Sequence, residues 1–403
     1  MTVMTARMLT GIDDLLDHRE AWNRLWERSD AYEFQSRAEG IAHWVETFGD
    51  PSQFVAVVVA DSSGELVGGV PLLLDRRRPL SVLRMPANGW ANAGDMLIHS
   101  DCNSDDVAMK MVEQLRCESF DLLQFEFVRH QTPRWQSFMR AIDCLGGAID
   151  MSRIHPRVAI DIGDDWDRYF ACLSRNHRSS VRRGEKKAAK RGTLAIRHLP
   201  SPTDEELPEL LRTAFEIEHQ SWKGANQSSV IACDMFDYYL GEARLANRQG
   251  GLELWFLDLD GQAVAFEYCH RVRGRCLSYK IGYNEAFRDF GPGQVLRKHQ
   301  LQYYTDAEQT EPVTLFDTMG IADGAKAKWA TRRFETGCIN ASLGDTASNL
   351  YVRCRGSLRH LRSRLDRSSP PEPVTLGGES FHHDASIDQS LTANAMFNAM
   401  GQT

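Results

Sequence analysis

The chain has 403 residues, of which 42% are hydrophobic and 25% are charged, and its formal net charge at pH 7 is −8. This length allows two domains with separate cores, and the acidic balance argues against a protein whose whole surface binds nucleic acid. No stretch approaches the roughly 18 successive apolar residues of a membrane-spanning helix, so no transmembrane segment is expected.

The nine cysteines are scattered and include no C-x-x-C pair. Such a pattern favours reduced thiols in a cytoplasm over a disulfide framework or a zinc site, so no metal is expected. The N-terminus has no long apolar segment of the kind that marks a secretory signal, which also favours a cytoplasmic protein.

The first half alternates between helical and extended patterns. We expect an α/β domain over residues 1–163. Its predicted helices cover 11–30, 38–48, 104–117 and 133–142, and its predicted strands cover 54–60, 66–74, 120–128 and a stretch near 156–162.

A basic helix is predicted next, within residues 164–192, and Gly192 ends it as a C-cap residue should. Its cations are Arg182, Arg183, Lys186, Lys187, Lys190 and Arg191. The preferred interpretation is a solvated helix that links two domains. The alternative is a surface for phosphates of coenzyme A, a sugar nucleotide, lipid headgroups or tRNA.

The second half predicts a domain over 193–347, then a helix at 348–365 and a mostly disordered tail at 366–403. The order of its elements is strand, two helices, three strands, helix, strand, helix, strand. The predicted strands are 193–198, 252–258, 262–272, 276–283, 313–317 and 334–343, and the helices are 203–222, 234–248, one from 294 and one near 322–331.

One turn in this domain points to a ligand. The segment Arg288-x-x-Gly291-x-Gly293 joins the strand 276–283 to the helix from 294. A helix that begins at a glycine turn directs free backbone N–H groups, and the positive end of its dipole, at one spot. This spot suits a pyrophosphate. No Lys follows as in a nucleotide-triphosphate loop, and no acidic residue is placed for the ribose of NAD.

The turn resembles the coenzyme A pyrophosphate loop of the GNAT acyltransferase superfamily. More narrowly, residues from about 165 to 345 resemble its Fem-like group, found in bacterial envelope polysaccharide loci. The matching pieces are 174–183, His219–Lys223, 282–296, Phe316–Asp317 and Lys326-x-x-Trp329. The resemblance implies a tandem GNAT-like architecture of two mixed-sheet domains with flanking helices, the first of them degenerate.

The resemblance also implies an acyl-CoA (acetyl-CoA) co-substrate, bound in the gap where strands 276–283 and 313–317 diverge. The expected cofactor-binding residues are Arg288, Phe290, Gly291, Gly293, Gln294, Val295 and Leu296. The family pattern usually has Tyr before the late Lys, whereas this chain has Ala325. Any role for that aromatic ring is therefore lost.

Acyl transfer to an amine needs a proton acceptor and a group that protonates the leaving thiolate. Glu267 and Asp317 are the candidate bases, and Tyr279 is the candidate proton donor. Each has a structural alternative: an ion-paired strand carboxylate, a turn cap and a packed strand ring. Candidate substrate-binding residues are Trp222, Lys223, Lys326 and Trp329, although we favour the core for Trp222.

The sequence therefore predicts an acyl-CoA-dependent N-acyltransferase that acts directly on an amine of a small or envelope-polysaccharide precursor, without an acyl-enzyme. A Fem-type transferase that uses aminoacyl-tRNA is the first alternative, although such enzymes tend to lack an intact pyrophosphate loop. A non-catalytic scaffold in polysaccharide assembly is the second. The acceptor, the acyl chain length and the oligomeric state are left open.

Overall fold

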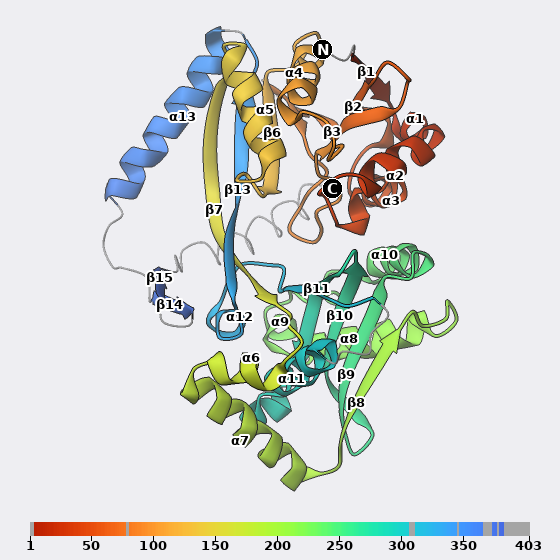
Figure 1. Ribbon diagram of the computed structural model, residues 1–403, viewed down its shortest axis with the longest axis vertical. Coiled ribbons are helices and arrows are strands. Elements are labelled where there is room, and N and C mark those ends of the chain that lie inside the picture. The colour runs from red at the N-terminus through yellow and green to blue at the C-terminus, as the bar shows by residue number, and fades with distance from the viewer. Residues whose placement is uncertain are drawn as a thin grey trace. The chain divides into compact units, whose positions relative to one another are not determined.

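The computed structural model describes residues 4–77, 80–305, 311–344, 346–365, 373–376 and 379–382. These residues fall into two compact units (Figure 1). Unit 1 contains residues up to 155 together with 335–365, and unit 2 contains residues 156–334 and the short strands near the C-terminus.

Unit 1 is a mixed sheet with helices on both faces. Its strands lie in the order β1-β2-β3-β4-β6-β13, and β5 pairs with β3. Gly68 and Gly69 of β3 show how the faces are covered, because a Cβ at Gly68 would meet Val107 of α4 and one at Gly69 would meet Trp22 of α2. The elements are β1 (Thr5–Thr10), α1 (Ile12–Asp17), α2 (Arg19–Glu27), α3 (Ala38–Phe48), β2 (Phe54–Ala60), β3 (Leu66–Arg77), β4 (Leu80–Arg84), β5 (Leu97–Ile98), α4 (Ser104–Leu115), β6 (Leu122–Val128), α5 (Pro133–Cys144) and α13 (Thr346–Leu365).

The strands of unit 2 lie in the order β7-β12-β11-β10-β9-β8. Only the β11–β12 pair is parallel among the neighbours in this order. Its elements are β7 (Ala148–Asp161), whose last residues belong here, α6 (Trp166–Cys172), α7 (Arg175–Arg191), β8 (Leu194–Pro200), α8 (Leu207–His219), α9 (Trp222–Ala225), α10 (Phe236–Arg248), β9 (Leu252–Leu259), β10 (Gln262–Val272), β11 (Arg275–Tyr283), η3 (Glu285–Phe290), α11 (Pro292–Thr305), β12 (Leu315–Asp317), α12 (Gly324–Ala327) and β13 (Arg332–Ser342).

Side chains of β10 show which helix covers which face of this sheet. Phe266 packs edge-to-face on Phe215 of α8, at 6.2 Å between ring centroids. Its neighbour Glu267 binds Arg297 of α11. Because successive residues of a strand point to opposite faces, α8 and α10 cover one face and α11 covers the other.

Each unit repeats one order of elements, and the two final strands are exchanged. Unit 1 runs β1, α1–α3, β2, β3, β4, α4, β6, α5, β7, and unit 2 runs β8, α8–α10, β9, β10, β11, α11, β12, α12, β13. Both contain one parallel pair, β4–β6 and β11–β12. However, β7 pairs with β12, and β13 pairs with β6. The tandem GNAT-like architecture expected from the sequence is therefore the fold observed.

The exchange changes the predicted division of the chain. The sequence suggested domains at 1–163 and 193–347, whereas the compact units meet inside β7 and inside β13. The physical reason is strand pairing: Asp161 at the end of β7 pairs with Leu315 of β12, and Gly337 of β13 pairs with Val128 of β6. A local pattern of hydrophobicity carries no information about which sheet a strand joins.

Three smaller differences concern the ends of the chain and one strand. The sequence reading missed β1, and β7 begins well before the predicted strand near 156–162. In the predicted tail, 373–376 and 379–382 pair as an antiparallel hairpin. Residues 366–372, 377–378 and 383–403 lie outside the described residues.

Packing of α7 on the turn before α11 gives a stability test. Gly184 lies where an added Cβ would come within 2.3 Å of the backbone oxygen of Phe290. Gly184→Ala should lower the free energy of unfolding by about 1–3 kcal/mol, since backbone cannot yield as a flexible side chain can. Urea unfolding measures it. Gly163→Ala is the control, because a Cβ there meets nothing within 4 Å. Equal stability of the two variants would contradict this packing.

Candidate functional site

The turn between β11 and α11 has the backbone that its glycines predict. Gly291 has φ 65° and ψ 62°, a left-handed conformation that glycine adopts without strain. It ends η3 and lets α11 begin at Pro292, where a missing N–H costs nothing. The N–H groups of Gln294 and Val295 both donate to the Gly291 oxygen, at 3.0 and 3.2 Å. Part of the expected run of free amides is thus satisfied within the turn, and Gly293 carries the remaining first-turn N–H group.

Space is available next to these glycines. A Cβ added at Gly291 would meet only a Gln294 side-chain atom at 4.0 Å, and one at Gly293 would meet only Tyr283 at 3.9 Å. Arg288 is solvent-exposed and pairs with Glu285 at 3.2 Å. The turn can therefore be approached by a ligand.

Three predicted cofactor-binding residues serve the core through their side chains. Phe290, Val295 and Leu296 are at most 4% exposed and pack in one hydrophobic cluster of unit 2. Only their backbone could touch a ligand. The apolar spacing that predicted a helix is also what places these side chains in the core.

A gap between β11 and β12 begins where their backbone pairing ends. The two strands pair in parallel at Arg275, Cys276 and Leu277, and the pairing ends where Leu277 meets Asp317. Beyond this point β11 continues to Tyr283. The β10–β11 register also shifts there, from the pair Tyr268–Lys280 to the pair Cys269–Ser278, so that Tyr279 is an extra residue on β11. Such a bulge re-aims side chains.

Asp317 ends β12 at the edge of this gap. It is 1% exposed, and its carboxylate accepts a hydrogen bond from the Met319 N–H at 2.9 Å. Met319 and Gly320 follow with φ 43° and 60°. The structure thus shows the turn cap that was the alternative role for Asp317. The same hydrogen bond fixes the carboxylate at the position where β11 and β12 separate.

Glu267 does not face the gap as a free base. Its carboxylate forms a bidentate ion pair with Arg297 of α11, at 2.6 and 3.1 Å, and Ser278 donates a further hydrogen bond. Glu267 and Arg297 are 1% and 4% exposed at their side chains. Both carboxylate oxygens are therefore engaged by protein groups on the α11 side of the sheet. The structural alternative for Glu267, pairing with a cation, describes these contacts.

Trp329 is another residue whose position corrects the sequence reading. It is 1% exposed, its indole N–H donates to Gln294 at 2.7 Å, and its ring packs edge-to-face on His177 at 4.5 Å. Burial lowers the pKa of His177 to about 4, helped by the charge of Lys328. Trp329 therefore packs against the first turn of α11 and is not available to a substrate.

Trp222 is exposed, whereas the sequence favoured a place for it in the core. Its side chain is 55% exposed, at the start of α9. The next residue, Lys223, reaches inward to Glu218 at 2.6 Å and to the Ile281 oxygen of β11 at 3.3 Å. An exposed aromatic ring beside a lysine that contacts β11 keeps this segment as a candidate substrate contact.

Lys326 lies on the β12 side of the gap. Its ammonium donates to the Ile321 oxygen at 3.1 Å and is 3.7 Å from Asp323. A Cβ at Gly320 would meet the Lys326 ammonium at 2.9 Å and Arg157 at 4.0 Å. Burial lowers the pKa of Lys326, and Asp323 opposes this shift.

A buried polar cluster on the α8/α10 face of the sheet was not found from the sequence. Tyr268 donates to Glu242 of α10, and a ring nitrogen of His270 lies 3.0 Å from the Tyr268 oxygen. Burial lowers the pKa of His270 to about 3. Tyr279 packs its ring 4.4 Å from that of His270. The one sequence signal was polar residues among apolar ones in β10 and β11.

The basic helix α7 belongs to unit 2 and lies against the glycine turn. Its buried face includes His177, Val181, Gly184 and Ala188. Lys187 donates to the Asp289 oxygen at 3.0 Å. This corrects the preferred interpretation of a purely solvated linker, because one face of the helix packs on η3 and α11.

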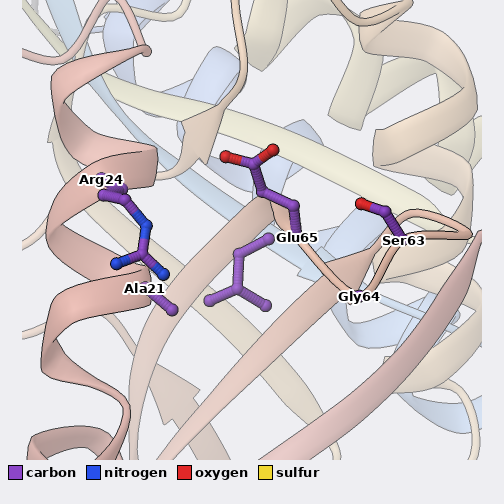
Figure 2. Close-up of a pocket in the computed structure, with 6 residues that line it drawn as sticks. Ala21, Arg24, Ser63, Gly64 and Glu65 are labelled. Carbon is purple, nitrogen blue, oxygen red and sulfur yellow. The ribbon is translucent and has the colours of Figure 1, made fainter.

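A shallow pocket lies in unit 1, and Figure 2 shows its lining residues. Arg24 from α2 and Glu65 from the turn between β2 and β3 border it, with Ala21, Ser63, Gly64 and Leu66. None of the site residues expected from the sequence lines this pocket.

The described part of the chain shows neither a metal site nor a membrane-spanning helix. Within it, no group of three or more His, Cys, Asp or Glu side chains could hold a metal ion. No described helix is long and apolar enough to cross a membrane.

Comparison with known proteins agrees with this geometry. Residues 175–327 match the family described as "Acetyltransferase (GNAT) domain". No curated protein matches the chain in sequence.

Solved structures share the fold at low identity. One is FemX, with 12% identity and a TM-score of 0.52, covering 80% of this chain and 95% of FemX. Another is a conserved protein of unknown function from Bacteroides thetaiotaomicron, with 12% identity and a TM-score of 0.50, covering 82% and 97% of the two chains. Residues 175–327 are therefore similar to a GNAT domain, and the fold of the chain is similar to that of FemX.

The structural role of the Glu267–Arg297 ion pair can be tested by its effect on stability. Glu267→Gln should lower the free energy of unfolding by about 3 kcal/mol, because it leaves a buried guanidinium without its counter-charge. The double variant Glu267→Leu/Arg297→Met should recover most of the loss. Glu209→Gln, which breaks the exposed pair with Arg212, should change stability by less than about 1 kcal/mol. Urea unfolding measures all three, and an unchanged Glu267→Gln protein would refute the structural role.

Proposed function

We propose, from the GNAT domain at residues 175–327, that this protein is an acyl-CoA-dependent N-acyltransferase. It would transfer an acyl group, acetyl in the first instance, directly to an amine of a small or envelope-polysaccharide precursor. The proposal includes a cytoplasmic location, where acyl-CoA is available.

One observation carries the proposal: the open glycine turn before α11 lies at the end of the strand that borders the gap. Gly291 and Gly293 leave room for a diphosphate, and α11 is regular from Pro292 to Thr305, so its dipole favours an anion at the turn. The β11–β12 ladder ends at Leu277 and Asp317. A pantetheine chain running from the turn into this gap would bring its thioester beside Asp317.

Unit 1 lacks the corresponding feature, although it repeats the order of elements. Its helix α4 occupies the place of α11 in that order, and it begins at Asn103, whose side chain accepts from the Asp105 N–H. Asp105 and Asp106 put two carboxylates in the first turn. These negative charges oppose a phosphate where a helix dipole would attract one. The proposal therefore assigns the donor to unit 2 alone.

The transfer forms a C–N bond and breaks the C–S bond of the thioester. The amine must lose a proton, and the thiolate must gain one. We assign to Asp317 the task of holding the amine against the thioester, since it borders the gap on β12. Tyr279, the extra residue of the bulge, is the assigned proton donor to the thiolate. Lys223 and Trp222 on α9 and Lys326 beyond β12 are the assigned acceptor contacts.

A second candidate is a Fem-type transferase that takes its acyl group from aminoacyl-tRNA. The observation in its favour is the outer face of α7, where Arg182, Arg183, Lys186 and Lys190 are exposed beside the turn that Lys187 contacts. A run of cations is the usual contact for a nucleic-acid backbone. Binding measurements separate this donor from acyl-CoA.

Ligand-induced stabilisation tests the donor site. At a concentration 100 times its Kd, acetyl-CoA should stabilise the protein by about 2.7 kcal/mol, which a thermal-shift assay detects. Gly293→Trp should abolish the shift by filling the space at the turn. Gly163→Trp, at another open glycine, should keep it. A response to aminoacyl-tRNA but not to acetyl-CoA would favour the second candidate. No response to either would leave a scaffold role.

Asp317 can be tested by separating binding from turnover. Asp317→Asn should lower kcat by about 100-fold, because a misplaced amine no longer meets the thioester in a reactive geometry. The thermal shift with acetyl-CoA should survive, since the phosphates bind at the glycine turn. Release of CoA from acetyl-CoA in the presence of glucosamine measures turnover. Asp164→Asn, at an exposed position, is the control. Full activity of Asp317→Asn would remove Asp317 from the site.

A further inference from the structure

A lysine on β11 stands where the proposed transfer needs a proton acceptor. Lys280 follows the bulged residue Tyr279 and pairs with Tyr268 of β10. It lies three positions beyond Leu277, the last residue of β11 that pairs with β12. The end of the ladder and the bulge thus coincide at the segment that carries Lys280.

The Lys280 ammonium points to the α8/α10 face of the sheet. It lies 4.6 Å from the centre of the Tyr239 ring of α10. Its strand neighbour Ile281 accepts a hydrogen bond from Lys223 of α9 at 3.3 Å. Gly282, two positions on, faces α8, because a Cβ there would meet Glu218 at 3.1 Å. Lys280 therefore belongs to the wall formed by α8, α9 and α10.

Burial is the main influence on the protonation of Lys280. Glu218 and Glu242 favour the ammonium form, Lys223 opposes it, and the thiol of Cys233 favours it slightly. Burial is the largest effect, and the result lowers the pKa of Lys280 to about 8. Tyr239 and Tyr268 also lie beside it, and burial raises the pKa of both well above 10. Both are therefore neutral near pH 8. Part of the residue remains exposed to solvent.

The amine should approach from this same face. On the opposite face, α11 packs on the sheet through Arg297 and a hydrophobic cluster. The donor's phosphates, held at the first turn of α11, would also occupy that side. We therefore place the acceptor on the side of α8, α9 and α10, where Trp222 of α9 exposes its ring.

We propose that Lys280 is the general base of the transfer, in place of the two carboxylates that the sequence suggested. This inference rests on the proposed function. The neutral Lys280 amine takes one proton from the acceptor ammonium and becomes an ammonium itself. The freed amine attacks the thioester carbonyl, the C–N bond forms, and the C–S bond breaks to release the CoA thiolate. The thiolate then takes up the second proton of the amine and leaves as the CoA thiol.

Two variants test the base directly. Lys280→Met removes the amine, and Lys280→Arg keeps a charge that cannot be lost. Both should lower kcat for CoA release from acetyl-CoA with glucosamine by about 100- to 10,000-fold while the thermal shift with acetyl-CoA remains. Lys110→Met, on an exposed lysine of unit 1, should keep wild-type kcat. A loss of less than about tenfold in Lys280→Met overturns the proposal.

The pH profile separates a base from a structural residue. Because the neutral amine is the active form, kcat of the wild type should rise with pH through about 8. The pH at which kcat rises should not change when glucosamine is replaced by a more basic alkylamine. The rise should vanish in Lys280→Met. A rise that persists unchanged in Lys280→Met overturns the proposal.

Chemical labelling tests the amine without any turnover. Trace acetic anhydride acylates neutral amines, and mass spectrometry can follow Lys280 and Lys110 in the same chain from pH 6 to pH 11. The midpoint for Lys280 should lie at about pH 8, below that of an exposed lysine. Equal midpoints overturn the inference even if the enzyme is active. A low midpoint in a protein that releases no CoA with any amine overturns the proposed function, and the base role with it.

Discussion

The site depends on a buried ion pair that ties α11 to the sheet. Arg297 reaches from the second turn of α11 to Glu267 on β10, and Ser278 of β11 donates to the same carboxylate. Neither charge is solvated, so each is stable only with the other in place. The pair fixes where α11 lies along β11, and thereby where the glycine turn at its start meets the end of that strand. Trp329, bonded to Gln294, supports the same turn from another side.

The two units show that a fold and a site are separate properties. Both repeat one order of strands and helices, and both contain a single parallel pair. Unit 2 has Gly291 in a left-handed conformation before its helix, whereas unit 1 has Asn103 as an N-cap and two aspartates in the corresponding first turn. The dipoles of both helices attract negative charge at their N-termini, but in unit 1 the chain's own carboxylates already supply that charge.

The two faces of the unit 2 sheet carry different kinds of side chain. Toward α11, β10 and β11 carry apolar side chains together with Glu267, which pairs with Arg297. Toward α8 and α10, the same strands carry Tyr268, His270 and Lys280. The bulge at Tyr279 changes the alternation on β11, so that a count along the sequence assigns Lys280 to the wrong face. A register shift of one residue is sufficient for this, because the period of a strand is two.

The sequence by itself determined the local features, namely most helices and strands and the glycine turn, whereas the tandem GNAT-like architecture was implied by a family resemblance. The local features follow from spacing and from residues with restricted backbones, which act over a few positions. Tertiary structure alone decided that Glu267 is paired, that Trp329 is buried while Trp222 is exposed, and that β7 and β13 are exchanged. Each of these depends on which distant strand or helix lies opposite, because burial and charge pairing are properties of contacts between segments. The position of Lys280 belongs to the same class, since one bulged residue sets its direction.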